Sequence, residues 1–335
     1  MSLIVRPLKS ASNTTLESGL SAGNVGSAEI RVKGKAAFVP SVEIDGRTVI
    51  STGKWLKIAV VRDEELVEGD TVPDPELFIA QLKRSGLNAD IFTFGQKLPD
   101  ILPRYDYYLE WDSLAVIPIT TYLDWSTRLA KPDVRTAVKR ATKRGLVTRE
   151  VEFNGTLVEG IVGIYNESPL RQGKPFWHYN KDFNEVKEMS STYLQRATFI
   201  GAYFGDELVG FIKMVRVGSL ALTFHVISMM KYFNKKPTNA LIAKAVEICA
   251  DKGLSHLIYG HFRYGGRKNS LTEFKERNGF NEVLVPRYYV PLTKSGNLAL
   301  RCKLHHGIGS ILPPGIWKAL SYARAQMWSL RRKGK

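Results

Sequence analysis

The sequence predicts an α+β fold with one mixed sheet, because its C-terminal part shows three strands, a helix and a further strand in succession. Three antiparallel strands are expected over residues 197–228, with turn signals at Gly205-Asp206 and Gly218-Ser219. An apolar stripe at helical spacing predicts a helix over 237–252. The apolar run 254–260 after it predicts a buried strand, and this succession is typical of a mixed sheet.

The chain divides into four predicted parts. Residues 1–28 are rich in Ser, Gly, Asn and Thr, which predicts a flexible arm. Residues 29–130 combine strand patterns with one helix and predict an α/β subdomain. Residues 131–300 hold the strands and helix described above, as a second domain. Residues 301–335 contain eight Lys or Arg and no carboxylate, and predict a basic helical tail.

Composition points to a polyanionic partner and a reducing compartment. The net charge of +16 over 335 residues suits RNA, an anionic membrane surface or a phosphate-rich cofactor, although a basic surface without such a partner is equally compatible. Two cysteines cannot form a disulfide framework, and no signal peptide or long apolar run is present. We therefore expect a cytoplasmic protein, with contact at the inner face of a membrane through the tail as an alternative.

Two basic segments, at 131–145 and at the start of the helix 237–252, could face a phosphate. Residues 131–145 form a predicted helix rich in basic side chains, namely Lys131, Arg135, Lys139, Arg140, Lys143 and Arg144. The loop MMKYFNKKPTNA opens the helix 237–252, and a helix N-terminus favours anions. The expected cofactor-binding residues are Lys235, Lys236, Thr238 and Asn239. The alternative is a capped helix whose lysines lie in solvent.

The order of elements over 197–292 resembles the GNAT superfamily of acyltransferases. The stretch KPDVRTAVKRATKRGLVTREVEF, an aromatic loop, the three strands and YG…SLTEFKERNGF resemble the Fem family of peptidyltransferases over about residues 130–292. That resemblance implies two tandem GNAT-like halves, the first degenerate, and transfer of an amino acid from aminoacyl-tRNA to an amine. It also points to the pair Phe274-Lys275. The loop at 229–240 lacks the glycines of GNAT acyl-CoA loops, which argues against coenzyme A.

The loop over 165–183 concentrates polar and aromatic residues between a predicted helix and the three strands, and such loops are common binding sites. The expected catalytic residues are Glu167, His178 and Tyr179, with Glu167 or His178 as a general base. The expected substrate-binding residues are Arg171, Gln172, Lys174 and Trp177, which could hold an anion or stack on a ring. The alternative is a packed surface loop with an aromatic anchor.

Several other polar residues are secondary candidates. His261, Arg263 and Lys275 lie near the C-terminal end of the strand at 254–260 and are expected to bind substrate. His225 is expected to be a core histidine. His305-His306 has no third ligand nearby in the sequence, so we expect no metal site.

Together these features predict a transferase that moves an acyl or aminoacyl group to an amine or hydroxyl of a small-molecule or peptide acceptor. Aminoacyl-tRNA or acyl-CoA would be a co-substrate, and no permanently bound cofactor is expected. One alternative is an ordinary acyl-CoA-dependent N-acetyltransferase. Another is a catalytically silent GNAT-like protein that binds tRNA or another RNA, or a membrane, through its basic helices.

Overall fold

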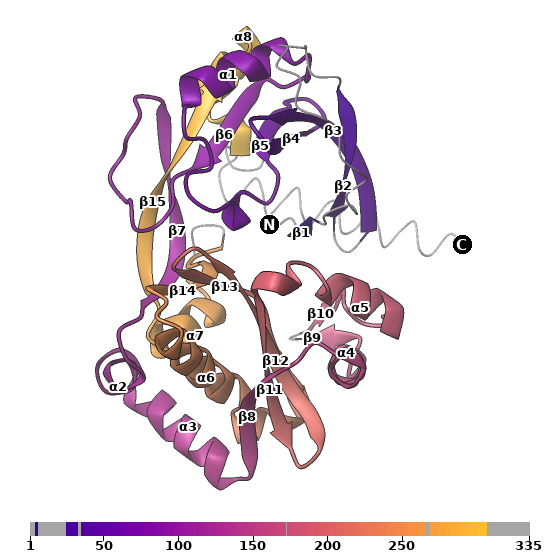
Figure 1. The fold of residues 1–335 in the computed structure, drawn as a ribbon, viewed down its shortest axis with the longest axis vertical. Coiled ribbons are helices and arrows are strands. Elements are labelled where there is room, and N and C mark those ends of the chain that lie inside the picture. Colours follow the sequence, from indigo (N-terminus) through magenta and orange to yellow (C-terminus); the bar gives the residue numbers. More distant parts are fainter. Residues whose placement is uncertain (1–3, 6–24, 33–34, 172, 265–267, 307–335) are drawn as a thin grey trace.

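The computed structural model describes residues 4–5, 25–32, 35–171, 173–264 and 268–306. Within these ranges thirteen strands form one continuous mixed sheet (Figure 1). Their spatial order is β1 (Ile4–Val5), β2 (Gly26–Val32), β3 (Lys35–Ile44), β4 (Arg47–Thr52), β5 (Ile58–Val61), β6 (Ile91–Gly95), β15 (Asn281–Pro291), β7 (Tyr108–Pro118), β14 (His256–His261), β13 (Leu220–Ser228), β12 (Glu207–Val217), β11 (Ala197–Phe204) and β8 (Leu146–Val151). A separate ribbon pairs β9 (Leu170–Arg171) with β10 (Lys174–Pro175). The predicted α+β class with a mixed sheet is confirmed.

Helices connect and cover these strands. They are α1 (Pro75–Arg84), α2 (Tyr122–Asp124), α3 (Pro132–Lys143), α4 (Gly155–Tyr165), α5 (Phe183–Ser190), α6 (Pro237–Asp251), α7 (Ser270–Arg277) and α8 (Lys294–Arg301). Short 3-10 helices span Glu64–Leu66, Leu194–Arg196, Met230–Lys235 and Leu304–His306, and a π-helical turn spans Trp125–Leu129. The predicted turns at Gly205 and Gly218 are both present, and both glycines have a positive φ.

The sheet contains two halves with the same succession of elements. In the first, the antiparallel strands β3, β4 and β5 lead into α1 and then into β6, which runs parallel to β5. In the second, the antiparallel strands β11, β12 and β13 lead into α6 and then into β14, parallel to β13. Helices α4 and α5 separate β8 from β11 in the second half, whereas only residues 33–34 separate β2 from β3 in the first. The first half therefore lacks a counterpart of helices α4 and α5.

The two halves exchange strands at the centre of the sheet. Strand β7 follows β6 in the chain but pairs with β14 of the second half, and β15 follows α7 but pairs with β6 of the first. The two exchanged strands also pair with each other from Asn281 to Tyr289. The sheet thus runs without interruption across the boundary expected near residue 130.

An ion cluster lies at this exchange. Arg287 on β15 pairs with Asp112 on β7, with Nε and Oδ2 2.6 Å apart, and with Glu64 of the 3-10 helix Glu64–Leu66. Burial opposes the charge of Arg287, but the two carboxylates outweigh that effect and raise its pKa. The guanidinium therefore joins strands from both halves.

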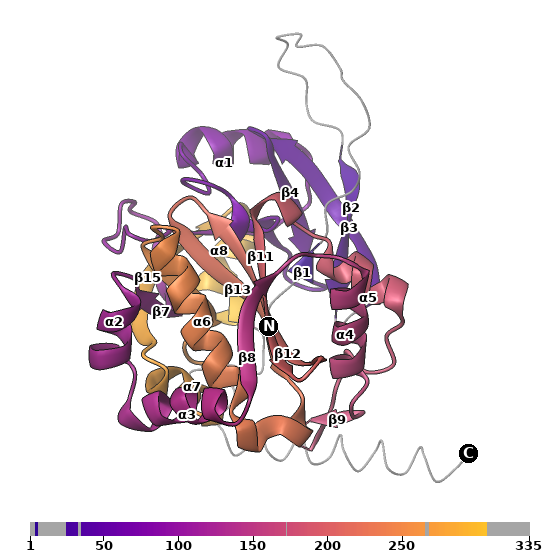
Figure 2. The same ribbon diagram turned by 60° about the horizontal axis from the view of Figure 1, so that its bottom comes forward.

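Two layers of helix cover the second half. Helices α6 and α3 pack on the face that carries Ile200 and Ile212, and α4 and α5 pack on the face that carries Phe199 and Phe211. Figure 2 shows α6 and α4 on opposite sides of the strands. Successive residues of a strand point to opposite faces, so the nearly unbroken apolar runs of β11 and β12 are the expected pattern for a sheet buried on both sides.

Candidate functional site

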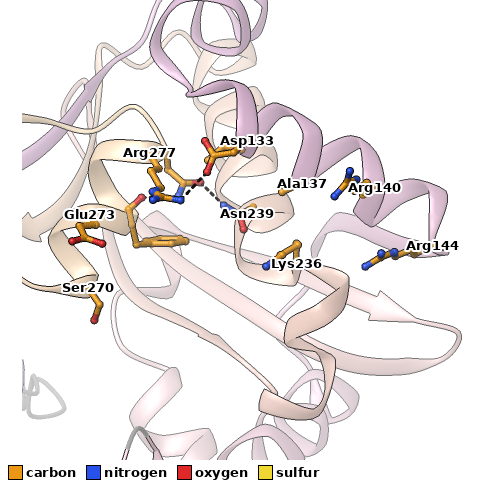
Figure 3. Close-up of a pocket in the computed structure, with 12 residues that line it drawn as sticks. Asp133, Ala137, Arg140, Arg144, Lys236, Asn239, Ser270, Glu273 and Arg277 are labelled. Atoms are coloured by element: carbon orange, nitrogen blue, oxygen red, sulfur yellow. Dashed lines mark hydrogen bonds and ion pairs between the residues drawn. The ribbon is translucent and has the colours of Figure 1, made fainter.

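A cavity of about 500 Å³ opens between α3, the start of α6 and α7 (Figure 3). Four cationic and two anionic side chains line it, so its lining is positive. The lining residues are Asp133, Val134, Ala137, Arg140, Arg144, Lys236, Asn239, Ser270, Glu273, Phe274, Arg277 and Asn278. The elements come from residues 132–143, 237–251 and 270–277, which the fold brings together on one side of the sheet.

The N-terminus of α6 is open to this cavity. Lys236 precedes the helix in a left-handed conformation (φ 59°), and Pro237 occupies the first helical position. No side chain caps this end, because the N-cap residue Lys236 has no acceptor atom. The next two polar side chains are bonded elsewhere, with Thr238 Oγ1 2.7 Å from Ser228 Oγ and Asn239 Nδ2 donating to Asn278 Oδ1 at 3.1 Å. The backbone N–H groups of Thr238 and Asn239 consequently have no acceptor in the described ranges. Unpaired N–H groups at a helix N-terminus form an anion-binding surface.

The cations around this end differ in how they are paired. Arg277 forms an ion pair with Asp133 at 3.1 Å, and Arg144 donates a hydrogen bond to the carbonyl of Asn234. The exposed side chains of Arg140 and Lys236 have no ion-pair or hydrogen-bond partner among the residues that the structure describes. Two exposed charges without a counter-ion therefore lie beside two free N–H groups, an arrangement that suits a phosphate.

A second structural feature lies next to the cavity, where β13 and β14 diverge. These strands pair only between Leu220–Leu222 and His256–Ile258, and from Thr223 onward no strand pairs with this side of β13 in the part of the chain described. The register between β12 and β13 also shifts at Lys213–Met214, opposite Thr223–His225. Unpaired backbone groups along β13 are thus available to another chain or ligand.

Lys275 of α7 is buried at the end of β14. Its Nζ donates to the His261 carbonyl at 2.7 Å and lies 4.6 Å and 4.9 Å from the ring centres of Tyr259 and Tyr264. Burial lowers the pKa of Lys275 to about 8. The same helix supplies Phe274 to the cavity, so the predicted Phe274-Lys275 pair lies between the cavity and the diverging strands.

The loop over 165–183 is held by many internal bonds. Glu167 accepts the backbone N–H groups of Met230 and Lys231 at 2.7 Å and 2.8 Å, and so caps the 3-10 helix Met230–Lys235. Arg171 donates to the Ser228 carbonyl at 3.0 Å and lies 3.4 Å from Glu167. Both side chains therefore stabilise the segment that leads into α6, and their proposed roles as base and anion ligand stay predictions.

The remaining predicted residues of this loop separate into buried and exposed groups. His178 is buried against Tyr165, with ring centres 4.2 Å apart, and burial followed by the nearby His225 lowers its pKa to about 2. It therefore remains neutral and is poorly suited to accept a proton. Trp177 and Tyr179 are exposed, as is Lys174, while Gln172 lies outside the described residues.

His225 is buried in the second half of the sheet, as expected for a core histidine. It lies opposite Lys213 in the β12–β13 register, and burial followed by this lysine lowers its pKa to about 4. Lys213 itself donates to the carbonyls of Ser190 and Thr192 at 2.9 Å and 2.6 Å, and so fixes the end of α5 to the sheet. Neither group opens to the cavity lining, which supports structural roles.

The structure distributes the other predicted residues unevenly. Lys236 and Asn239 line the cavity, whereas Lys235 Nζ lies 3.8 Å from the ring centre of Phe204. Arg263 forms an ion pair with Glu282 at 2.6 Å. Arg140 and Arg144 line the cavity, although the sequence predicted them only as part of a basic helix. Their spacing of four residues indicates that they share a helix face, and this was the sequence pattern from which their joint role could have been predicted. The tail with Trp317, Leu320 and Trp328 lies outside the described residues.

The expectation that His305-His306 lacks a third ligand is wrong. Glu110 of β7 lies 2.9 Å from His305 Nε2 and 2.7 Å from His306 Nε2. The sequence separates Glu110 from His305 by 195 positions, so the proximity arises only from the pairing of β7 with β15 and the return of the chain through α8.

In the described ranges no helix combines the length and apolarity needed to cross a membrane.

Two solved structures share this fold. One is the C-terminal domain of a protein named as a lysylphosphatidylglycerol synthetase from Agrobacterium fabrum, with a TM-score of 0.52, 14% identity, and coverage of 78% of this chain and 87% of that one. The other is FemX, with a TM-score of 0.50, 10% identity, and coverage of 83% of this chain and 90% of that one. No protein-family model matches the sequence, and no curated protein is detectably similar. The chain therefore shares its overall fold with FemX, as the resemblance to the Fem family implies.

Proposed function

We propose that this chain is an acyl-group transferase that takes an aminoacyl group from aminoacyl-tRNA and passes it to an amine or hydroxyl acceptor. The observation that carries the proposal is the positive cavity at the open N-terminus of α6, where Arg140 and Lys236 lack counter-ions among the described residues. The fold shared with FemX and with a protein named as a lysylphosphatidylglycerol synthetase supports a transferase of this kind.

The basic helix favours RNA over coenzyme A as the donor. Exposed cations extend from Lys139 to Arg144 at the C-terminal end of α3, and two of them, Arg140 and Arg144, line the cavity. Four exposed cations, Lys139, Arg140, Lys143 and Arg144, lie within about 7.5 Å of helix, and this density of charge suits the phosphates of a nucleic-acid strand. The loop before α6 contains no glycine, and within the described ranges the start of the helix offers only two N–H groups without an acceptor, a small number for a phosphate-cradling loop.

The chemistry of such a transfer matches the groups near the diverging strands. The acceptor nitrogen or oxygen bonds to the ester carbonyl carbon of the donor and loses a proton, the bond from that carbon to the ribose oxygen breaks, and the released ribose oxygen takes up a proton, so that the transfer is proton-neutral. Negative charge develops on the carbonyl oxygen, and preorganised backbone N–H groups of β13 would stabilise it. Lys275, buried beside His261, would add positive potential there.

A donor panel tests the proposal on the full chain. Binding of aminoacylated tRNA, uncharged tRNA and acetyl-CoA would be measured at about 50 and 200 mM salt, together with transfer of a radiolabelled amino acid to amine acceptors. We expect tRNA to bind with strong salt dependence, Arg140→Glu to weaken it, and Arg216→Glu, an exposed site on β12, to leave it unchanged. Stabilisation by acetyl-CoA alone would identify an acyl-CoA enzyme instead. Binding without transfer from any donor would favour a catalytically silent protein.

A further inference from the structure

A cluster of three metal-ligating side chains lies in the other half of the sheet from the α6 cavity. Glu110 projects from β7, and His305 and His306 belong to the 3-10 helix Leu304–His306 that follows α8. One ligand atom from each residue lies within 4.8 Å of the others. Both Nε2 atoms approach the same carboxylate, at 2.9 Å and 2.7 Å.

We propose that Glu110, His305 and His306 bind a divalent transition metal ion of the Zn²⁺ class. Two imidazoles and one carboxylate form a ligand set that suits zinc, and three protein ligands leave one position for water or another ligand. Metal–ligand bonds of about 2.0–2.2 Å place neighbouring donor atoms of a tetrahedral site about 3.3 Å apart. The present separations are about half an ångström shorter, so a small side-chain adjustment accommodates the ion.

The surroundings of the cluster hold one imidazole in place and leave the other accessible. The His305 side chain is fully buried between the rings of Tyr108 and Tyr289, with ring centres 5.7 Å and 4.8 Å away, which fixes the imidazole. Its Nδ1 is buried without a hydrogen-bond partner in the described ranges, so the neutral ring can carry its proton there and present a lone pair on Nε2. His306 keeps 45% of its side chain exposed, which provides a path for the ion.

The sequence also limits what else could bind the ion. Residues 307–335 contain no His, Cys, Asp or Glu, so the segment after the cluster supplies no further side chain of these types. Cys302 is exposed and near in sequence, but it does not belong to the group of converging ligand atoms. A water molecule would complete a tetrahedral site, as in zinc centres that keep an open position.

Metal titration of the full chain tests the assignment. Protein freed of metal with EDTA and then desalted would be titrated with Co²⁺ by visible absorption, followed by displacement with Zn²⁺. We expect one equivalent to bind, and His306→Gln and Glu110→Gln each to weaken Co²⁺ binding by about 100-fold or more. The control variants Cys302→Ser and His256→Gln should bind like the wild type, because neither side chain belongs to the cluster.

Thermal unfolding provides a second readout. Added Zn²⁺ should raise the Tm of the wild type and of Cys302→Ser but not that of His306→Gln, since an ion that binds only the folded state stabilises it. Circular dichroism would establish that each variant is folded, and His306 is exposed enough for its replacement to leave the core intact. Absence of saturable binding, equal binding by Glu110→Gln, or loss of binding in Cys302→Ser would each overturn the three-ligand site.

Discussion

Helices α1 and α6 occupy the same position in the two halves of the sheet, yet their N-termini differ in charge. Each helix connects the last antiparallel strand of its half to a parallel strand. Helix α1 begins after Asp74, whose carboxylate accepts the N–H of Leu77 at 3.0 Å, and Glu76 lies in its first turn. Helix α6 begins after Lys236 and has no side-chain cap.

The comparison shows how one architecture can serve stability in one half and binding in the other. A carboxylate at the start of α1 satisfies the helix dipole and leaves little attraction for an anion. The open end of α6 forgoes a cap that is typically worth about 1 kcal/mol, and keeps its N–H groups for a ligand. The proposed function of the second half rests on this difference, so the predictions below act on the two halves separately.

The largest expected effect is on donor binding. Reversing the charge of α3 with Arg140→Glu and Arg144→Glu together should weaken tRNA binding about 100-fold at low salt and reduce the salt slope by about 2, because two phosphate contacts are lost. The matched variant Lys83→Glu with Arg84→Glu reverses two exposed charges on α1 and should bind almost as the wild type. Equal losses in both variants would mean that only net charge matters.

Acid should destabilise the second half of the sheet, because the buried imidazoles of His178 and His225 lie there, with ring centres 5.6 Å apart. Burial holds the pKa of His225 at about 4, below its value of about 6.5 in an unfolded chain. The unfolded state therefore binds more protons between these values, and stability falls as the pH falls through that window. At pH 5 the loss from His225 is on the order of 2 kcal/mol relative to pH 7.

Urea unfolding at pH 7 and pH 5 measures this contribution. His225→Gln should shrink the difference between the two pH values, whatever it does to the absolute free energy of unfolding. Phe211→Leu alters a neighbouring core residue, whose ring centre lies 6.0 Å from that of His225, and it should lower stability equally at both pH values. An unchanged pH dependence in His225→Gln would contradict the assignment.

Replacement of Glu167 distinguishes a structural role for this side chain from a catalytic one. Glu167→Gln should lower the free energy of unfolding by about 1–2 kcal/mol, because a neutral amide is a weaker acceptor for the N–H groups of Met230 and Lys231. Turnover at saturating donor should change less than tenfold, since a lost general base usually costs about 10²–10⁴-fold. A hundredfold fall in turnover with wild-type stability would instead identify Glu167 as the base.

The smallest effect concerns the residue before α6. Lys236→Gly should raise stability by up to about 1 kcal/mol, because glycine adopts the left-handed conformation without steric cost, while donor binding weakens several-fold. Asp74→Ala at the start of α1 should do the reverse, lowering stability by about 1 kcal/mol and leaving binding unchanged. Paired unfolding and binding curves would check both, and a Lys236→Gly protein that binds normally would remove Lys236 from the site.

Much of the fold follows from local pattern. Turn glycines, apolar alternation and helix punctuation predict the three strands, α3 and α6, because these signals depend on neighbouring residues. The exchange of β7 and β15 is not predictable in this way, since a strand pattern does not specify its pairing partner. The sequence likewise indicates the basic helix and the helix start at Lys236, but not the proximity of Glu110 to His305.

The exchanged strands also bear on how the chain is made. Strand β6 has β5 on one side, but its other neighbour, β15, emerges from the ribosome only after everything from Gly95 to Asn281 has been synthesised. At about 5–20 residues per second, that interval is roughly 10–40 s, during which an apolar strand edge in the first half stays uncovered. The first half therefore cannot complete its sheet during translation until the second has been made, and the nascent chain has a window in which a chaperone can act.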